Sequence, residues 1–531
     1  MNKKIKNLYL NLRDKINTNR TGMVVAILFT ISLLPVIYVG FHNYATGDDY
    51  WYGVHTYRGW VESGLLGALK GSLLTVMEFY ENWQGTWFTM FLFTLSPNHF
   101  WENGYIITAF ISLGCLIGSI AYLANFYLVN KLNFTRGAAA ICVCIISYLA
   151  IQYIPRTTSG IYWFNGVMHY SIPFLLGVLA IVHSHKFIEN KRRKDYIILL
   201  ICFFLLGGGS YLAPLATTLT VCLLLVCQLR ITKLSIKKRK FVFHYDWKNL
   251  YIIPAIVLEI IGLVVSFKAP GNNVRGGEEF GFNLKWALQC IYYAIDRGIY
   301  LGEDYFLKNP VTTVLYIILA IVIWNQLWRT NREKNKFCFP LIFVLFMNGI
   351  YWATYVPEIY SRSDVSGGVP NTYFHVFLII TIANIIYVHG WIQVQLLKYW
   401  KRKAQKLEID YKVIRENSLF YSKKYVAYIE LPIIILGITI FLLVSRCSGI
   451  MTTNDYCISC ISNGTLDKYG QVRKEQHEIL MNTEQEDVVI PEIGAPYPLL
   501  NMLVTDSMDD SRNIDRAKYY DKKSVIAEMV N

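Results

Sequence analysis

Residues 23–40 read MVVAILFTISLLPVIYVG, and Gly47-Asp48-Asp49-Tyr50 follows seven residues later. The first stretch is a run of eighteen uncharged residues, which is about the length that a helix needs to cross a bilayer. The second places two adjacent carboxylates where the chain has just left that apolar run. A membrane span followed closely by an acidic pair is the starting point for the interpretation of the whole chain.

The composition predicts a membrane protein. Hydrophobic residues make up 54% of the 531 residues and charged residues only 17%, against about 25% charged in soluble domains. Apolar runs of membrane-spanning length recur along the chain. They predict an all-α polytopic protein with about eleven transmembrane helices, at 23–40, 104–129, 137–154, 171–188, 196–211, 212–229, 250–267, 311–328, 337–355, 371–394 and 426–446.

The net charge of +14 does not indicate a nucleic-acid partner, because the basic residues lie in short loops between apolar runs. Every sizeable basic cluster falls in alternate loops, for example at 191–194, 237–240 and 401–403. Such loops face the cytoplasm in membrane proteins. We therefore expect residues 1–22 inside, the C-terminus outside and a transmembrane module over 23–446.

Two polar segments are expected on the outer side. The first outer loop, 41–103, contains apolar residues at helical spacing over 64–80, which is typical of a helix lying in the membrane interface. The apolar stretch 83–95 has thirteen residues, too few to span, so we expect it on the outer face or half-buried. From Ser448 onward the chain carries eight basic and fourteen acidic residues, so 447–531 is predicted to be a small outer domain that packs on the first loop, with a helix over 469–481.

Two features offer chemistry of other kinds. Cys457-x-x-Cys460 is compatible with a disulfide or a metal site, but a lone CxxC without a second pair is weak evidence. We predict no metal and no cofactor. Glu259 is an acid well inside a predicted span, and a carboxylate at that depth is either functional or the partner of a polar group on a neighbouring span.

The candidate site lies in four predicted outer loops, 41–103, 155–170, 268–310 and 356–370. Together they supply carboxylates, aromatic rings and cations. Aromatic faces stack on sugar rings, and arginine binds phosphate through two parallel hydrogen bonds. The candidate catalytic residues are Asp48 and Asp49, and the candidate substrate-binding residues are Tyr50, Arg58, Trp83, Arg156, Tyr162, Trp163, His169, Tyr170, Asn272, Arg275 and Arg362.

The order of short motifs carries a resemblance. The chain has a GDDY element after the first span, then Trp83-x-Gly85, Tyr162-Trp163 with Tyr170, Pro270-Gly271-Asn272-x-x-Arg275 and, in the tail, Tyr519-Tyr520. This succession resembles the GT-C superfamily of membrane glycosyltransferases and, more narrowly, a bacterial family of multi-pass membrane proteins without an assigned function. The resemblance covers nearly the whole chain, although each motif is short.

The resemblance implies a GT-C-like fold in a bacterial cytoplasmic membrane. It implies a sugar donor carried on polyprenyl phosphate and a cell-envelope glycan or glycopolymer as acceptor. Asp48 or Asp49 would then be the general base for an inverting transfer on the outer face. Arg275, Arg156 and Arg362 would lie opposite the charge of the leaving phosphate.

Simpler interpretations of the same residues stay open. Asp48 or Asp49 is also suited to cap a helix that begins near Tyr50. The tryptophan and tyrosine residues are compatible with an aromatic belt at the headgroup level. Pro270-Gly271-Asn272 is a turn signature in its own right. Arg275 has Glu278 and Glu279 close by as alternative partners.

Three other functions compete with the transferase. A transporter or flippase is favoured by Glu259 and by the Gly207-Gly208-Gly209 break. A polysaccharide polymerase or ligase would use the same lipid-linked substrates, with a large outer loop late in the chain. A non-catalytic scaffold would not depend on the acidic pair at all.

Overall fold

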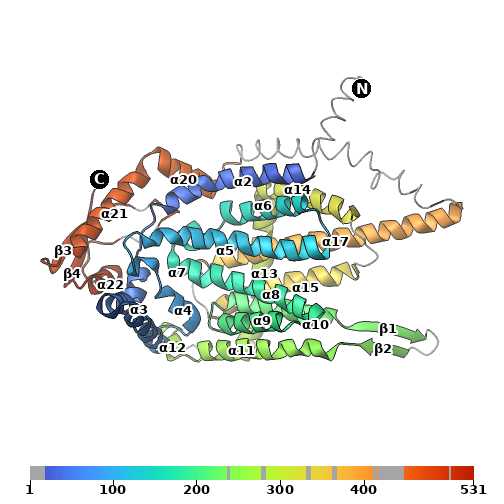
Figure 1. Ribbon diagram of the computed structural model, residues 1–531, viewed down its shortest axis with the longest axis horizontal. Helices are drawn as coiled ribbons and strands as arrows, with labels where there is room; N and C mark the ends of the chain where they lie inside the picture. Colours follow the sequence, from blue (N-terminus) through green and yellow to red (C-terminus); the bar gives the residue numbers. More distant parts are fainter. Residues whose placement is uncertain are drawn as a thin grey trace, which may run out of the picture.

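The structure is a computed structural model, and it describes residues 18–235, 240–276, 283–329, 337–361, 367–408, 410, 414, 448–494, 496–500 and 504–530. Most of these residues are helical. Figure 1 shows a bundle of helices that run roughly along the long axis of the molecule, with a smaller group of short elements at one end. We call the end that carries α3 and the C-terminal segment the α3 end.

The described part of the chain contains seven helices that are long and apolar enough to cross a membrane. Their outward faces keep large apolar side chains exposed, as on α2 at Ile27, Ile31 and Leu34. The protein is therefore membrane-embedded. The seven are α2 (Thr18–Gly40), the continuous η2–α5–η3 helix (Gly104–Lys131, with α5 at Ile107–Ala124), the continuous α7–η5–α8 helix (Phe164–Asn190, with α8 at Ile172–Asn190), η6–α11 (Trp247–Phe267, with α11 at Ile253–Phe267), α14 (Pro310–Arg329), α15–α16 (Pro340–Ser361) and α17 (Val369–Leu407).

Three further predicted spans correspond to shorter helices in the same bundle, and these are α6 (Arg136–Gln152), α9 (Arg193–Gly207) and α10 (Leu212–Cys227). α9 and α10 are separated at Gly208, the position of the glycine break. The eleventh predicted span, 426–446, lies outside the described residues. A mostly helical membrane protein is thus confirmed, with seven full-length spans among the described residues.

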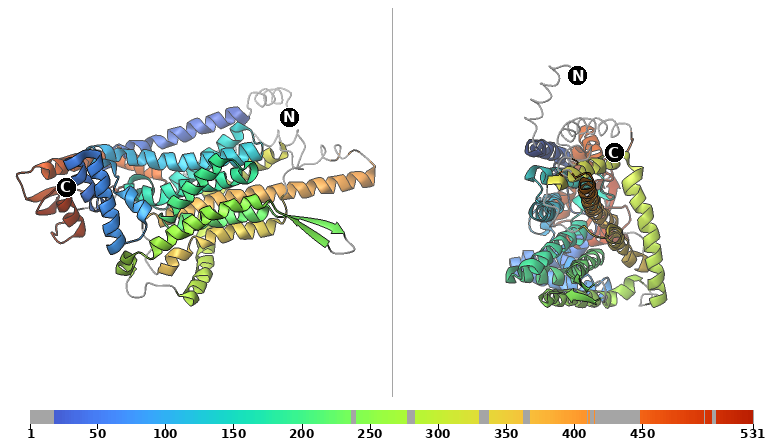
Figure 2. Two further views of the ribbon diagram at one scale, coloured as in Figure 1. Left: turned by 60° about the horizontal axis from the view of Figure 1, so that its bottom comes forward. Right: turned by 90° about the vertical axis from the view of Figure 1, so that its right-hand side faces the viewer.

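Helix α3 (Asp48–Asn82) is a bent pair of helical arms. Ser63 and Gly64 leave helical geometry, and Gly64 has a φ of 60°, which glycine adopts without strain. The arms fold against each other so closely that a Cβ on Gly59 would lie 2.2 Å from the Gly67 carbonyl oxygen. The left panel of Figure 2 shows α3 crossing the direction of the bundle.

The second arm of α3 has the amphipathic character predicted for 64–80. Leu65, Leu66, Leu73 and Met77 are all exposed. Small buried residues, among them Ala68 and Ser72, face the first arm. A helix that lies across the bundle with one apolar face outward is suited to the membrane interface. The following helix α4 (Trp87–Phe93) has seven residues and does not span.

Two other segments depart from what the sequence predicted. The basic loop around 237–240 contains an antiparallel pair, β1 (Arg230–Ser235) and β2 (Lys240–His244), at the end of the bundle opposite to α3. Between η6–α11 and α14, the chain forms the short helix α12 (Pro270–Gly276), the amphipathic helix α13 (Leu284–Glu303) and the turn η7 (Asp304–Lys308). Figure 2 shows α13 also crossing the direction of the bundle.

The C-terminal segment folds against the α3 end. Its first two helices are α20 (Thr453–Ser462) and α21 (Thr465–Met481), the second matching the predicted helix over 469–481. Two strands, β3 (Asp487–Glu492) and β4 (Ser524–Met529), pair in parallel with α22 (Ser511–Tyr519) between them in the chain. This strand pair was not predicted. Cys457 and Cys460 are both free thiols.

Candidate functional site

The carboxylate of Asp49 is enclosed at the beginning of α3. It is fully buried, and its Oδ2 accepts hydrogen bonds from the backbone N–H of Thr46 at 2.9 Å and from the hydroxyl of Tyr105 at 2.6 Å. The Tyr105 oxygen in turn accepts the backbone N–H of Phe164 at 2.9 Å. Burial raises the pKa of Asp49 to about 7 although these donors act to lower it. Asp49 therefore joins the start of α3 to α5 and α7.

This geometry corrects the prediction for Asp49. Gly47 is the N-cap of α3 and makes no side-chain capping bond, so neither aspartate is the N-cap that the simpler interpretation expected. The Asp49 carboxylate instead accepts the backbone N–H of Thr46, three residues upstream. An acceptor hydroxyl in solvent has no access to a carboxylate with no exposed surface. Asp49 is a positioning residue, and the catalytic prediction is left with Asp48.

Asp48 points to a different environment. It is partly exposed, and no described residue donates a hydrogen bond to its carboxylate. Burial raises the pKa of Asp48, while the nearby positive charge of Arg275 lowers it. The pKa of Asp515 on α22 is raised to about 6, mainly by burial and in part by the negative charge of Asp48. Asp515 therefore lies within electrostatic reach of Asp48, which the sequence did not suggest.

Arg275 reaches this place because α12 interlocks with the end of α3. Its Nη1 donates to Oε1 of Gln84 at 2.6 Å, and its guanidinium lies 5.1 Å from the centre of the Trp83 ring. The Oδ1 of Asn272 accepts the backbone N–H of Gly85 at 3.3 Å. A Cβ on Gly85 would lie 1.8 Å from the carbonyl oxygen of Ser266, so only glycine fits. The two short motifs, distant in sequence, form one structural unit.

This unit revises the roles of two predicted residues. Pro270 begins a short helix, so the turn interpretation holds only for the entry to α12. Asn272 uses its amide in the fold, since Nδ2 donates to the carbonyls of Ser266 and Phe267 at 2.7 and 3.0 Å. Asn272 thus holds α12 against the end of α3, and its substrate-binding role stays a prediction. Glu278 and Glu279 lie outside the described residues.

Aromatic side chains build the wall beside Arg275. The ring of Trp83 packs edge-on against Trp51 at 5.2 Å, and Phe93 lies 5.7 Å from the ring of His169. The Nδ1 of His169 is 3.0 Å from the hydroxyl of Thr89 on α4. Trp83 and His169 therefore belong to the region near Asp48, and His169 is hydrogen-bonded rather than placed as a metal ligand. Thr89 was not predicted to belong to the site, because only the fold brings α4 next to His169.

Two tyrosines that were predicted to bind substrate are buried inside the protein. Tyr162 is buried, and its hydroxyl donates to the Val36 carbonyl at 2.9 Å. Tyr50 is buried against Tyr519, with ring centres 5.0 Å apart. These side chains are enclosed because the C-terminal segment covers this part of the first loop.

Arg58 also belongs to that contact. Its Nη2 donates to the Lys518 carbonyl at 2.8 Å and to Asp521 at 3.2 Å. The guanidinium therefore links the first arm of α3 to the end of α22, and its substrate-binding role stays a prediction. The sequence did not indicate that Arg58 would contact Asp521, because the two residues are 463 positions apart in the chain.

The remaining candidates form a second group near the start of α17. Arg156 has an exposed side chain, and its backbone is held by the amide of Asn371 at 2.8 and 2.9 Å. Tyr170 and Trp163 lie beside Gly367 and Gly368. Arg362 lies outside the described residues.

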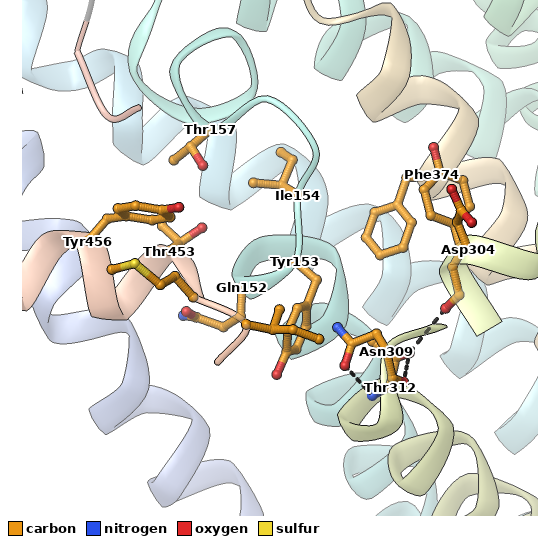
Figure 3. Close-up of a pocket in the computed structure, with 13 residues that line it drawn as sticks. Gln152, Tyr153, Ile154, Thr157, Asp304, Asn309, Thr312, Phe374, Thr453 and Tyr456 are labelled. Atoms are coloured by element: carbon orange, nitrogen blue, oxygen red, sulfur yellow. Dashed lines mark hydrogen bonds between the residues drawn. The ribbon is translucent and has the colours of Figure 1, made fainter. Parts of the chain in front are cut away.

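A cavity of about 230 Å³ opens near this second group, between the end of α6, η7, the start of α14 and the first residues of the C-terminal segment. Figure 3 shows Thr157, Asn309 and Tyr456 around the space, with Phe374 and Asp304 on its far side. Its lining is mainly hydroxyl, amide and aromatic, and it shares no residue with the wall beside Asp48. Such a lining is suited to a neutral polar ligand.

Within the described ranges, no group of three or more His, Cys, Asp or Glu side chains is placed to hold a metal ion. Comparison of the sequence with known proteins gave no match, either to a protein-family model or to a curated protein. The structure thus shows a membrane-embedded helical protein in which Arg275 packs on Trp83 and lies within electrostatic reach of Asp48 and His169.

Proposed function

We propose that this protein is a GT-C-like membrane glycosyltransferase, which moves a sugar from a polyprenyl-phosphate donor to a cell-envelope glycan. The observation that carries the proposal is the meeting of Asp48 with Arg275. A carboxylate without a hydrogen-bond donor among the described residues lies within electrostatic reach of an exposed guanidinium, beside an aromatic wall. This is the combination that transfer from a phosphate leaving group requires.

The chemistry follows from these groups. The acceptor hydroxyl attacks the anomeric carbon of the donor sugar, and its proton passes to the carboxylate of Asp48. The bond from that carbon to the phosphate oxygen breaks with inversion, and polyprenyl phosphate leaves with the electron pair. Arg275 lies where it would stabilise the charge that develops on the phosphate. The partly exposed ring of Trp83 beside it would add an aromatic surface for a sugar.

The proposed location is the outer side of a bacterial cytoplasmic membrane. Basic residues concentrate at the end opposite to α3, in Lys191–Lys194 between α8 and α9 and in Lys401–Lys403 near the end of α17. The positive-inside rule puts that end in the cytoplasm, and the α3 end outside. The exposed leucines of α3 would then rest at the outer membrane surface, where the isoprenoid tail of the donor is available.

The test is the composition of the cell-envelope glycan in strains that carry Asp48→Asn or Asp49→Asn. We expect Asp48→Asn to remove one sugar while the protein stays abundant and inserted. Asp49→Asn should alter the amount or stability of the protein more than the chemistry. Asp521→Asn, a change of an exposed carboxylate on the same end, is the matched control. An unchanged glycan profile in the Asp48→Asn strain, with normal protein level, would refute the transferase.

Transport is the second candidate, and one observation favours it. Glu259 is buried among α9, α10 and α11, where its Oε1 accepts the hydroxyl of Thr218 at 2.5 Å. Its Oε2 has no hydrogen-bond partner in the described part of the chain. An intramembrane carboxylate with a free oxygen beside a glycine break is typical of a transport path. Loss of substrate translocation in Glu259→Gln, with Asp48→Asn unaffected, would favour this function.

A further inference from the structure

A second pocket lies between the first loop and the C-terminal segment. Its volume is about 60 Å³, and its walls include Tyr50, Tyr105, Arg473, Lys474, His477 and Arg516. The basic residues come from α21 and α22, while the tyrosines come from α3 and from η2 (Gly104–Ile106) at the start of the second span. The pocket is therefore a junction between two distant parts of the chain.

Two arginines of this pocket are buried. Arg473 is 5% exposed and Arg516 is 1% exposed. Both donate to one acceptor, Oε1 of Gln476, at 2.9 and 3.1 Å. The Nη2 of Arg473 also donates to the Ala45 carbonyl at 2.5 Å, but the Nε of Arg516 has no acceptor among the described residues. A guanidinium has five N–H donors, so Arg516 has unused donors inside the protein.

The local charges do not balance. The carboxylate found within salt-bridge range of this arginine pair is Glu492, whose Oε2 lies 3.9 Å from Nη1 of Arg473. Its two oxygens already accept the backbone N–H groups of Ile493 and Val504 at 3.0 and 3.1 Å. Asp49 is a second buried carboxylate within electrostatic reach of Arg473, but burial raises its pKa to about 7. Among the described residues, the two enclosed guanidinium groups are therefore not matched by two fully ionised carboxylates. A buried charge without a counter-charge is strongly unfavourable. An anion bound in the pocket would supply the missing negative charge.

The edge of the pocket extends the positive charge toward solvent. Lys474 is exposed at the rim, and His477 lies beside Tyr520 with 3.4 Å between Nδ1 and the tyrosine hydroxyl. Glu102, which also lines the pocket, is exposed and so solvated. Donors on several sides, with more than one positive charge, match an anion with several oxygens and more than one negative charge.

We propose that this pocket binds a phosphoryl group through Arg473, Arg516 and Lys474. The phosphoryl group would join the C-terminal segment to the first loop, because Tyr50 and Tyr105 form the opposite wall. Tyr105 also donates to Asp49, so the bound group would stabilise the start of α3 that carries Asp48. This site is separate from the transfer reaction, and its test does not use glycan synthesis.

The experiment uses the purified full-length protein in a zwitterionic detergent, at low ionic strength and without other oxyanions. The unfolding midpoint is measured against inorganic phosphate and, separately, in nanodiscs of phosphatidylcholine with or without phosphatidic acid. Phosphate is expected to raise the midpoint with saturation if a free phosphoryl group fits. A rise only with phosphatidic acid would identify a lipid headgroup as the source. Sodium chloride added at the same ionic strength reports the general salt effect.

Two variants and a control test the residues. Arg516→Gln is expected to weaken phosphate or phosphatidic acid binding about tenfold or more, the loss of a charge-assisted hydrogen bond. Lys474→Gln, at the exposed rim, is expected to weaken it about two- to fourfold. Lys468→Gln removes the same charge from an exposed position of the same helix, outside the pocket lining, and is expected to leave binding unchanged.

If Arg516→Gln does not fold, the comparison of Lys474→Gln with Lys468→Gln still decides. A wild-type midpoint that responds to neither phosphate nor phosphatidic acid beyond the chloride control would overturn the proposal. So would equal binding by the Lys474→Gln and Lys468→Gln proteins. Arg473 and Arg516 would then only hold the C-terminal segment against the first loop, without a bound anion.

Discussion

Asp48 and Asp49 are neighbours in sequence, but they belong to two different regions of the molecule. The Asp48 side is open: its carboxylate is partly exposed, and Arg275 beside it is exposed as well. The Asp49 side is closed: the carboxylate is fully buried and held by Thr46 and Tyr105. Successive residues in the first turn of a helix point about 100° apart, so one carboxylate meets the solvent side while the other meets the bundle.

The two aspartates would therefore have different roles, with Asp49 holding the start of α3 and Asp48 taking part in the proposed reaction. Asp49 fixes the start of α3 against α5 and α7, so that the position of Asp48 is set by rigid elements. In the proposed reaction, the oxygens of Asp48 would accept the proton of the acceptor hydroxyl. Positioning and chemistry compete for the same lone pairs, and a site that needs both has to use two carboxylates.

The largest expected effect concerns the pH dependence of the closed side. The folded-state pKa of Asp49 is raised from 3.8 to about 7 by burial. The folded protein therefore holds a proton that the unfolded chain releases between about pH 4 and 7. Stability should fall with rising pH across this window, by at most about 1.4 kcal/mol per pH unit from this group. Asp49→Asn should lose that part of the slope in thermal unfolding from pH 4.5 to 8.

The control for this slope is Asp521→Asn, because the Asp521 carboxylate is almost fully exposed at 94%. Its unfolding curve should change with pH as the wild type does. Parallel pH curves for wild type and Asp49→Asn would show that the closed carboxylate is not held protonated, and the contrast between the two sides would weaken.

The next effect tests the open side. Arg275→Gln should lower the proposed transfer rate about 100-fold, as the loss of one charge-stabilising donor does in other active sites. Because Arg275 lowers the pKa of Asp48, its removal should also shift the acid limb of the pH–rate profile to higher pH, since Asp48 must be ionised to take a proton. Arg275→Lys should keep the limb nearer to its original position. A lower rate with an unmoved limb would separate Arg275 from Asp48.

A smaller effect is expected where α12 interlocks with α3. In Gly85→Ala the new methyl group would meet the Ser266 carbonyl oxygen, and we expect a loss of about 1–3 kcal/mol in stability. Gly118→Ala in α5 is the matched control, because a Cβ there meets no atom within 4 Å. Thermal unfolding in detergent compares the two. If Gly85→Ala is as stable as Gly118→Ala, the interlock is looser than its geometry implies.

The smallest effect is expected from Arg58→Ala. The pair that Arg58 forms with Asp521 is solvent-exposed, and exposed ion pairs contribute about 0.2–1 kcal/mol. Thermal unfolding should therefore change by a few degrees at most, and Asp521→Ala should change it less, since the bond to the Lys518 carbonyl remains. A large loss of transfer activity in folded Arg58→Ala protein would return Arg58 to the substrate-binding group.

The sequence by itself determined the class of the protein and much of its local structure. Runs of apolar residues predicted the membrane helices, because the bilayer requires long stretches without charge. The spacing of Leu65, Leu66, Leu69 and Leu73 predicted the interfacial arm of α3, since a helical period is a local property. The helix over 469–481 was predicted for the same reason.

Only the tertiary structure decided which residues meet. Trp83 and Gly85 reach Asn272 and Arg275 across almost 190 residues, and the contact depends on backbone approaches that no short-range pattern encodes. The parallel pairing of β3 with β4 depends in the same way on a connection through α22. Two adjacent aspartates look equivalent in a sequence, because their exposure is set by elements that arrive later in the chain. Tyr105 and Phe164 enclose the carboxylate of Asp49. Arg275 of α12 lies near Asp48, whose side chain stays partly exposed.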